Sequence, residues 1–238
     1  MDEQSDIIAA FSEMAPRYES LMNNELNRFW GISYEEFVNI LLSDIKTDSD
    51  DQILDIATGT GYIPAFFLAK GQPFKNIFGL DLTFGMLQGA KQKMDENRAI
   101  ESVSLLCASA HEIPIMTGIF DHAICCLATH HMNVPVLLKN IHRVLIVGGK
   151  VHIADAGGSA NWRNFIIKGI IKISAFIYFL FAENFSRAIA ESSAIANIYT
   201  SSDWKNLFIK QGFKDIKIRQ LKSKRFWAPD PIMIEASK

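Results

Sequence analysis

Residues 53–64 read Ile-Leu-Asp-Ile-Ala-Thr-Gly-Thr-Gly-Tyr-Ile-Pro. The apolar start of this segment, with an acid near its end, is typical of a buried parallel strand that stops at a tight turn. Gly59 and Gly61 supply a backbone that bends sharply and can approach a ligand without an intervening Cβ atom. The apolar run from Ile63 to Leu68 then begins a helix. A strand, a glycine turn and a helix in this order predict a doubly wound sheet that holds a nucleotide-like ligand at the carboxyl end of its first strand.

The glycine turn differs from two common phosphate-binding signatures. A P-loop needs Gly-Lys-Ser/Thr at its end, but Tyr62 and Ile63 follow the second glycine here. A dinucleotide fingerprint needs a third glycine, but Pro64 or Ala65 stands in that place. We therefore expect a ligand that brings no pyrophosphate to this turn. S-adenosylmethionine, with its uncharged sugar and its amino-acid group, fits that expectation.

A second strand, Asn76 to Thr83, also carries a carboxylate near its end. Asp81 follows the glycines by about twenty residues, the spacing at which an acid accepts hydrogen bonds from the two hydroxyls of a ribose. The alternative role for Asp81 is an N-cap of the next helix, Thr83 to Lys93. Both roles place the carboxylate at the same strand end.

The strings Leu-Asp-Ile-Ala-Thr-Gly-Thr-Gly and Gly-Leu-Asp-Leu-Thr-Phe-Gly-Met-Leu resemble the class I S-adenosylmethionine-dependent methyltransferases. Within them, the chain is most similar to the ubiquinone/menaquinone C-methyltransferase-like group (methyltransferase type 11/25). The resemblance runs from Phe11 to Ser159 and becomes generic beyond that point. It implies an α/β, Rossmann-like doubly wound sheet of seven strands, with strand seven antiparallel, helices on both faces and a helical lid.

The resemblance also implies a site for S-adenosylmethionine, with S-adenosylhomocysteine as the product. We expect Asp81 to hold the ribose, Asp55 to direct the cofactor's ammonium group or to order the loop, and Tyr18 to face the cofactor from the lid. The alternative for Tyr18 is packing of its ring against the core. Ser109 and Ala110 would border the adenine, but relatives usually carry Asp where Ser109 stands, and an uncharged hydroxyl accepts more weakly. Further contacts are expected from the glycine turn and its surroundings, at Ala57, Thr58, Gly59, Gly61, Leu82, Met86 and Leu127.

The fourth strand, Phe120 to Leu127, ends beside the glycine turn, where the reacting atoms are expected. His130 and His131 follow it, and we expect one of them to be the catalytic general base, because the pKa of histidine lies near working pH. The alternative is a histidine that caps the next helix or bonds to backbone. A zinc site with Cys125 and Cys126 is disfavoured, because adjacent strand residues point to opposite faces, and we predict no metal.

The whole chain predicts one domain in four segments. Residues 1–45 are an N-terminal helical lid segment, and residues 46–159 are the cofactor-binding Rossmann-like core. Residues 160–200 are an apolar helical insertion that adds to the lid. Residues 201–238 supply a closing helix, capped by Ser202 or Asp203, and a strand pair.

Two of these segments carry specific expectations. The N-terminal lid holds two helices, the second from Tyr34 to Leu42, with a polar patch at residues 23–27 between them. In the core, Gly148 and Gly149 reverse the chain into a fifth strand, Lys150 to Ala154.

Residues 165–182 are almost wholly apolar, with Lys168 and Lys172 spaced four apart. These two charges and Gly169 argue against a helix that spans a membrane. Three roles stay open for this segment. It is a lid that walls an apolar pocket, a helix that rests on a membrane surface, or a homodimer interface.

Composition and cysteine use indicate a globular protein suited to a reducing cytoplasm. The 238 residues are 49% hydrophobic and 21% charged, with a formal net charge of −2. That charge gives no field to attract nucleic acid, which is therefore disfavoured as a partner. Three cysteines, two of them adjacent, form no disulfide framework. The acidic, polar N-terminus differs from a signal or transit peptide.

We therefore predict methyl transfer to carbon or oxygen of a small lipophilic acceptor, such as a quinol, a phenol or an isoprenoid. The alternative is a non-methylating enzyme of the same fold, a cyclase or dehydratase that keeps the cofactor only for structure. A protein or RNA methyltransferase is disfavoured. Residues 128–131, Ala-Thr-His-His, stand where an Asn/Asp-Pro-Pro-Tyr motif would follow the fourth strand.

Overall fold

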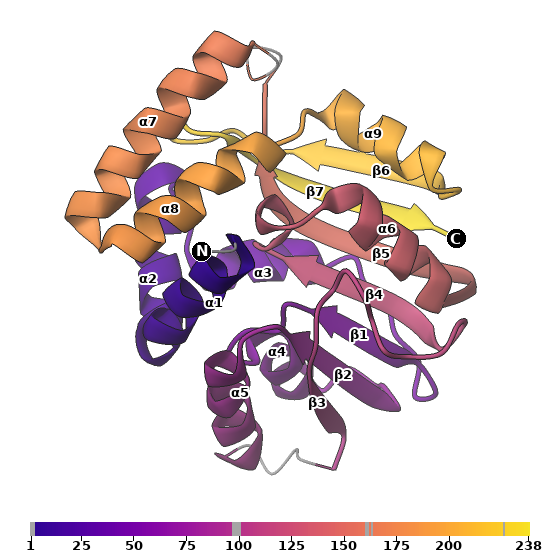
Figure 1. Cartoon of the computed structure of the whole chain (residues 1–238). Helices are drawn as coiled ribbons and strands as arrows, with labels where there is room; N and C mark the ends of the chain where they lie inside the picture. The colour runs from indigo at the N-terminus through magenta and orange to yellow at the C-terminus, as the bar shows by residue number, and fades with distance from the viewer. Residues whose placement is uncertain (1–2, 97–100, 160–161, 163, 226) are drawn as a thin grey trace.

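A seven-stranded sheet runs through the part of the chain that the computed structural model describes, residues 3–96, 101–159, 162, 164–225 and 227–238 (Figure 1). Its spatial order is β3-β2-β1-β4-β5-β7-β6. The strands are β1 (Gln52–Ile56), β2 (Asn76–Asp81), β3 (Val103–Cys107), β4 (Phe120–Cys126), β5 (Leu145–Gly157), β6 (Lys214–Gln220) and β7 (Asp230–Ser237).

Strands β1 to β5 pair in parallel, whereas β7 lies antiparallel between β5 and β6. This confirms the predicted doubly wound sheet with an antiparallel seventh strand. The strand order reverses direction between β1 and β4. In open α/β sheets such a reversal opens a crevice at the carboxyl ends of the strands, and ligands bind there.

Helices cover both faces of the sheet because side chains along each strand alternate in direction. Leu54 of β1 packs with α6 (Val134–Val144) and α9 (Ser201–Lys210) in one buried cluster. Its neighbour Ile53 packs with α3 (Tyr34–Leu42) and α4 (Tyr62–Lys70) in the other. Helix α5 (Phe84–Glu96) follows β2 and contributes Met94 to the second cluster.

The remaining helices gather at the carboxyl ends of the parallel strands (Figure 1). They are α1 (Glu3–Met14), α2 (Tyr18–Phe29), α7 (Phe165–Ala182) and α8 (Phe185–Ala194). Helices α7 and α8 pack against each other, and α1 packs against α8. Segments that are far apart in sequence therefore roof the crevice together, as a helical lid.

The N-terminal segment holds three α-helices, not the two predicted. The polar patch at residues 23–27 lies inside α2, and a short 3₁₀ turn at Ala15–Arg17 joins α1 to α2. The patch is compatible with a helix because two of its three asparagines lie on the outer face. Asn24 and Asn27 are exposed, while Leu26 is buried.

Strand β5 begins five residues before the predicted Lys150 and continues to Gly157. Gly148 has a φ of 82°, and the pairing register with β4 shifts between Phe120 and His122. The prediction that the two glycines reverse the chain into a new strand was therefore wrong. They form an irregularity within one long strand, because glycine adopts the left-handed conformation at little cost.

The cap of α9 also differs from the prediction. Thr200 is the N-cap, and its Oγ1 accepts a hydrogen bond from the backbone N–H of Asp203 at 3.3 Å. The carboxylate of Asp203 accepts in return from the N–H of Thr200 at 3.1 Å. Asp203 is thus the second member of a capping box, three residues inside the helix, and Ser202 is not the cap.

Candidate active site

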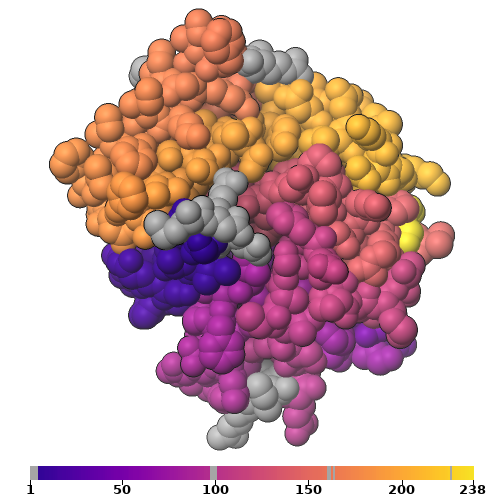
Figure 2. All heavy atoms as spheres, viewed as in Figure 1, coloured from indigo at the N-terminus to yellow at the C-terminus, as the bar shows by residue number. Residues whose placement is uncertain are grey.

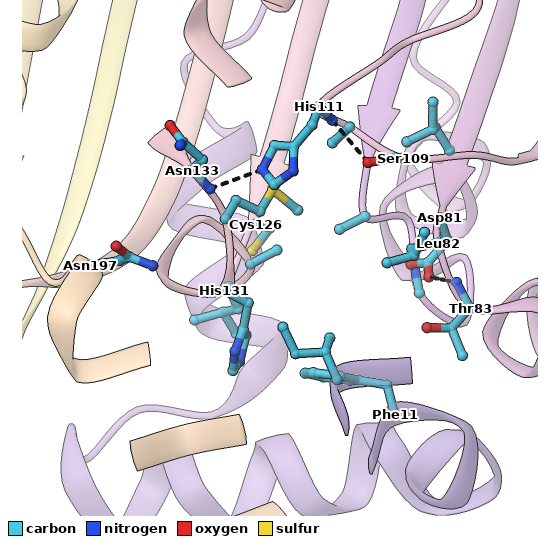
Figure 3. A pocket seen from close by; sticks show the side chains of 18 of the residues that line it. Phe11, Asp81, Leu82, Thr83, Ser109, His111, Cys126, His131, Asn133 and Asn197 are labelled. Atoms are coloured by element: carbon cyan, nitrogen blue, oxygen red, sulfur yellow. Dashed lines mark hydrogen bonds between the residues drawn. The ribbon is translucent and has the colours of Figure 1, made fainter. Parts of the chain in front are cut away.

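A cavity of about 660 Å³ lies at the carboxyl ends of the strands on both sides of the reversal in strand order (Figure 3). We call it the first cavity. Nine of the twelve residues predicted to contact the cofactor line it: Tyr18, Ala57, Gly59, Asp81, Leu82, Met86, Ser109, Ala110 and Leu127. The fold thus brings the glycine turn, the ends of β2 and β4 and the lid to one space.

The other three predicted residues, Asp55, Thr58 and Gly61, lie behind the cavity wall. Thr58 Oγ1 donates to Asp55 Oδ2 at 2.6 Å, and a Cβ on Gly61 would stand 3.1 Å from that of Ala90. Asp55 therefore orders the loop from beneath. Its Oδ1 is buried and accepts no hydrogen bond from the described residues, and burial raises the pKa of the carboxyl to about 7. The unmatched oxygen leaves a place for one more donor near the glycine turn.

Asp81 joins the glycine turn to the start of α5. Its Oδ2 accepts from the N–H of Gly59 at 2.9 Å, and its Oδ1 accepts from the N–H of Thr83 at 2.8 Å. The residue thus combines a cap-like contact with a position on the cavity wall, where Figure 3 shows it beside Leu82 and Thr83. Burial raises the pKa of this carboxyl. Each oxygen keeps acceptor capacity for a ligand hydroxyl.

Two wall residues hold a left-handed backbone without being glycine. Ala57 has a φ of 55° and Leu127 a φ of 53°. A side chain makes this conformation costly, by about 1–3 kcal/mol, so it persists only where the surroundings enforce it. The two residues end β1 and β4, the strands that flank the reversal in order. Strained backbone conformations of this kind are found most often at ligand-binding and active sites.

Ser109 lies on the opposite wall and belongs to a small polar network. Its Oγ accepts from the N–H of His111 at 3.2 Å, and the Nε2 of His111 accepts from the N–H of Asn133 at 2.9 Å (Figure 3). His111 and Asn133 line the first cavity but were not predicted to do so. One signal in the sequence could have indicated Asn133. It is the N-cap of α6, shortly after the end of β4, and residues that follow a strand end in this fold lie at the crevice.

The lid is tied to the glycine turn through Glu19. The carboxylate accepts from Thr60 Oγ1 at 2.6 Å and pairs with the ammonium of Lys93. The neighbouring Tyr18 ring lies 3.8 Å from the position that a Cβ on Gly59 would take, and it also packs on Tyr34 at a centroid distance of 6.5 Å. Tyr18 thus combines both predicted roles, facing the cavity and packing on the core.

A second cavity of about 560 Å³ adjoins the first. Phe11, Tyr18, Leu127 and His131 line both, so they form the shared wall. Helix α7 contributes a mostly apolar wall to the second cavity: Ile170, Ile171, Ser174, Ala175, Tyr178 and Phe179. Three roles were considered for the apolar insertion. The structure shows that α7 lines an apolar cavity, which is the first of them.

The polar part of the second cavity begins at His130. Its Nδ1 lies 2.5 Å from Asp155 Oδ1, and Asp155 also accepts from the hydroxyl of Thr129 and the N–H of Ala156. Burial lowers the pKa of His130, but the Asp155 carboxylate outweighs burial and holds that pKa above its ordinary value. The Asp155 carboxylate therefore favours the protonated form of His130, whose Nδ1 is placed to donate to it.

His131 has the opposite character. Its side chain is 7% exposed, and its Nε2 lies 3.6 Å from Glu191 Oε1. Burial lowers the pKa of His131, and the charge of His130 lowers it further. Its Nδ1 is buried and makes no hydrogen bond to the described residues. His131 is thus a neutral imidazole on the wall between the two cavities, with one ring nitrogen unused.

Two acids and an arginine from distant helices complete this cluster. The guanidinium of Arg187 lies 2.9 Å from Glu191 and 3.0 Å from Glu25. Neither Glu25 nor α8 residues Arg187 and Glu191 were predicted as site residues. They lie on α2 and α8, and nothing local in the sequence indicates that these helices meet. Only the packing of the lid brings their charges to the histidines.

His130, His131 and Glu191 also offer ligand atoms within 4.8 Å of one another, a spacing that one metal ion could use. Arg187 and Asp155 are already engaged with this group. The guanidinium charge next to Glu191 opposes a cation there. The donor set therefore fits proton transfer better than metal binding.

A family model described as a methyltransferase domain matches residues 54–153, the span that contains the glycine turn, Asp81 and both histidines. The chain carries a methyltransferase domain. Over 229 residues the methyltransferase is 26% identical to a demethylmenaquinone methyltransferase of Lactobacillus johnsonii, a match that covers 92% of this chain and 88% of that one. It is 29% identical over 150 residues to a ubiquinone/menaquinone biosynthesis C-methyltransferase of Geobacter sp., covering 63% and 62% of the two chains.

Solved structures agree on the fold of the methyltransferase. The YcgJ protein of Bacillus subtilis superposes with a TM-score of 0.66 at 15% identity, covering 86% of this chain and 99% of that one. Geranyl diphosphate C-methyltransferase of Streptomyces coelicolor, in complex with S-adenosyl-L-homocysteine, gives 0.67 at 13% identity, covering 92% and 83%. The predicted resemblance to the S-adenosylmethionine-dependent methyltransferases, and among them to the quinone-methylating group, is thereby confirmed.

Proposed function

We propose that the enzyme transfers a methyl group from S-adenosylmethionine in the first cavity to a small lipophilic acceptor in the second. The observation that carries this proposal is the shared wall between the two cavities. A donor and an acceptor that meet there are held for in-line attack and are shielded from water.

The residues of the first cavity fit the cofactor. Asp81 has acceptor capacity for the ribose hydroxyls, and the backbone at Gly59 leaves room for close approach. Asp55, behind the wall, holds the glycine turn in place through Thr58. The bound cofactor supplies an electrophilic methyl group on a sulfonium, so the protein need only position the partner and remove a proton.

The second cavity supports the choice of acceptor. Its α7 wall is apolar and suits a hydrocarbon chain, whereas the end next to His131 is polar and suits a hydroxyl. Relatives named for demethylmenaquinone and for ubiquinone/menaquinone biosynthesis favour a quinol-like head group with a greasy tail. Methylation of such a ring at carbon and methylation at oxygen both begin with loss of the hydroxyl proton.

His131 is the better placed of the two histidines to take that proton. It is neutral, and its unused Nδ1 lies in the wall between donor and acceptor. Glu191 then orients the ring from Nε2, the arrangement by which an acid fixes the tautomer of a base. His130 stays on Asp155, which favours its protonated form, and in that form it offers positive charge near the phenolate.

Incubation of the enzyme with methyl-labelled cofactor and a bacterial lipid extract tests the acceptor class. We expect label in a lipid-soluble product and one equivalent of S-adenosylhomocysteine for each methyl transferred. Label found only in polar metabolites or in protein contradicts a lipophilic acceptor. Conversion of a lipid with the cofactor left intact supports the non-methylating alternative instead.

A further inference from the structure

Helix α7 presents a second apolar face, which points away from the second cavity except at its edge, where Ile170 also lines that cavity. Six side chains at spacings of three or four residues form it, and they are 37–86% exposed: Ile166, Ile170, Ile173, Ile177, Leu180 and Phe181. Residues at these spacings share one side of a helix. Phe165 and Phe185 extend the strip at its two ends, being 82% and 58% exposed. Figure 2 shows α7, in orange, at one outer corner of the molecule.

This exposed face is wider than the seam of a coiled coil. On a helical wheel of 100° per residue, Phe165 and Phe181 lie about 160° apart, whereas a seam for one partner helix is narrower. Helix α7 contains no Asp or Glu, so two copies packed together would find no acids to pair with Lys172 at the border of the face. A broad apolar face bordered only by positive charge fits a lipid surface better than a second copy.

A loop with exposed basic and aromatic residues reaches α7 on the side of the second cavity. Lys222 and Arg225 are exposed on the loop after β6, and Trp227 on the same loop is 55% exposed. The Phe29 ring connects this loop to α7, since its centroid lies 5.7 Å from that of Trp227 and 5.8 Å from that of Tyr178. Tryptophan and basic side chains beside an apolar face are typical of membrane interfaces with anionic lipid.

The helix lies along a surface more readily than across a bilayer. Its length and composition would suffice for a span, with 18 residues and two lysines. The inner side of α7, however, is engaged with protein. It walls the second cavity, and Lys168 Nζ donates to the carbonyl of Ala196 at 3.0 Å. One face is therefore free for lipid while the other keeps its protein contacts.

We propose that the exposed face of α7, together with the basic loop at 222–225, docks the enzyme on an anionic bilayer surface. The inner face of the same helix walls the second cavity, so docking brings that cavity to the lipid phase. A lipophilic acceptor then enters from the membrane without crossing water. The docking itself depends neither on the cofactor nor on the proposed acceptor.

Flotation of the full chain with vesicles tests the docking, without cofactor or acceptor. We expect binding to vesicles of phosphatidylcholine with phosphatidylglycerol, and weaker binding to phosphatidylcholine alone. The double variant Ile173→Glu/Ile177→Glu should bind at least about tenfold more weakly, since charge replaces apolar area at the contact. Lys222→Glu/Arg225→Glu should remove the preference for anionic lipid. The matched control is Val147→Glu, at a position 90% exposed in β5, outside the strip.

Ile173 and Ile177 line neither cavity, so the double variant should keep wild-type turnover of a short-chain, water-soluble quinol. Loss of docking with turnover intact thus separates this proposal from the proposed function. Failure of the wild-type chain to bind either kind of vesicle overturns the proposal. A wild-type dimer in light scattering that the double variant converts to monomer, without vesicle binding, would assign the face to a second copy.

Discussion

The pKa values of two adjacent histidines shift in opposite directions because different acids contact them. Asp155 contacts the ring of His130 at 2.5 Å and raises its pKa against the effect of burial. Glu191 stands 3.6 Å from His131 and shares its charge with Arg187, so burial prevails there and the pKa falls. The sequence presented the pair as interchangeable candidates. The structure distinguishes them by charge, exposure and access to the first cavity.

Replacing His131 by Gln should lower kcat by about a hundredfold or more if its Nδ1 is the base, because glutamine cannot accept a proton. His130→Gln should lower kcat less, since it loses only a nearby positive charge. Binding of S-adenosylhomocysteine reports whether the first cavity is intact in each variant. His142→Gln, on the outer helix α6, is the matched control. Wild-type turnover in both variants and in the double variant would mean that the acceptor needs no protein base.

The pH dependence follows from the same pair. A base must be neutral, and the pKa of His131 is depressed, so kcat should stay high below the usual histidine range and fall only as pH drops through that depressed value. Asp155→Asn removes the acid that keeps His130 charged. The repulsion on His131 then disappears, its pKa rises, and the acid limb of the kcat profile should move to higher pH. An acid limb that does not move in Asp155→Asn would exclude His131 as the titrating group.

At the scale of secondary-structure elements, the lid is held by a few polar contacts and by aromatic packing. Glu19 joins α2 to the glycine turn through Thr60 and to α5 through Lys93. Tyr18, next to it, closes both cavities. Closure over the cofactor therefore depends on one carboxylate that bridges three elements. Glu19 is therefore expected to position the lid and to take no part in the methyl transfer itself.

Glu19→Ala should weaken S-adenosylhomocysteine binding by about tenfold or more, because a lost charged hydrogen bond of about 1.5–3 kcal/mol lets the lid move away from the glycine turn. Calorimetric titration measures the change, and the thermal midpoint reports whether the fold survives. Glu36→Ala, an exposed acid in the first turn of α3, is the matched control. Equal affinity in the two variants would show that the lid closes without Glu19.

At the scale of the whole molecule, the local parts of the site could be predicted and the long-range parts could not. The glycine turn and Asp81 are recognisable because each combines a strand end with a short, specific pattern. The seven-stranded topology followed from the family resemblance, and the sheet order confirms it. The family resemblance also supplied Tyr18, which lines both cavities from α2.

The acceptor side escaped prediction because it is assembled by tertiary packing. Glu25 on α2 meets Arg187 on α8 across 162 positions of sequence, and no local pattern marks either as functional. Their helices meet only because α1 packs on α8 at the sheet end. The apolar insertion was recognised from composition, but composition could not say which of its faces is covered. The structure shows that one face of α7 lines the second cavity and that the other face is exposed.

The most direct test of the account is calorimetric titration of S-adenosylhomocysteine into the wild-type protein and into Asp81→Ala. The account predicts micromolar binding to the wild-type chain. It predicts a loss of at least about tenfold in the variant, because a carboxylate that accepts ribose hydroxyls and holds the N–H of Gly59 contributes more than about 1.4 kcal/mol. No binding to the wild-type protein, or equal binding to both, would contradict the assignment of the first cavity to the cofactor.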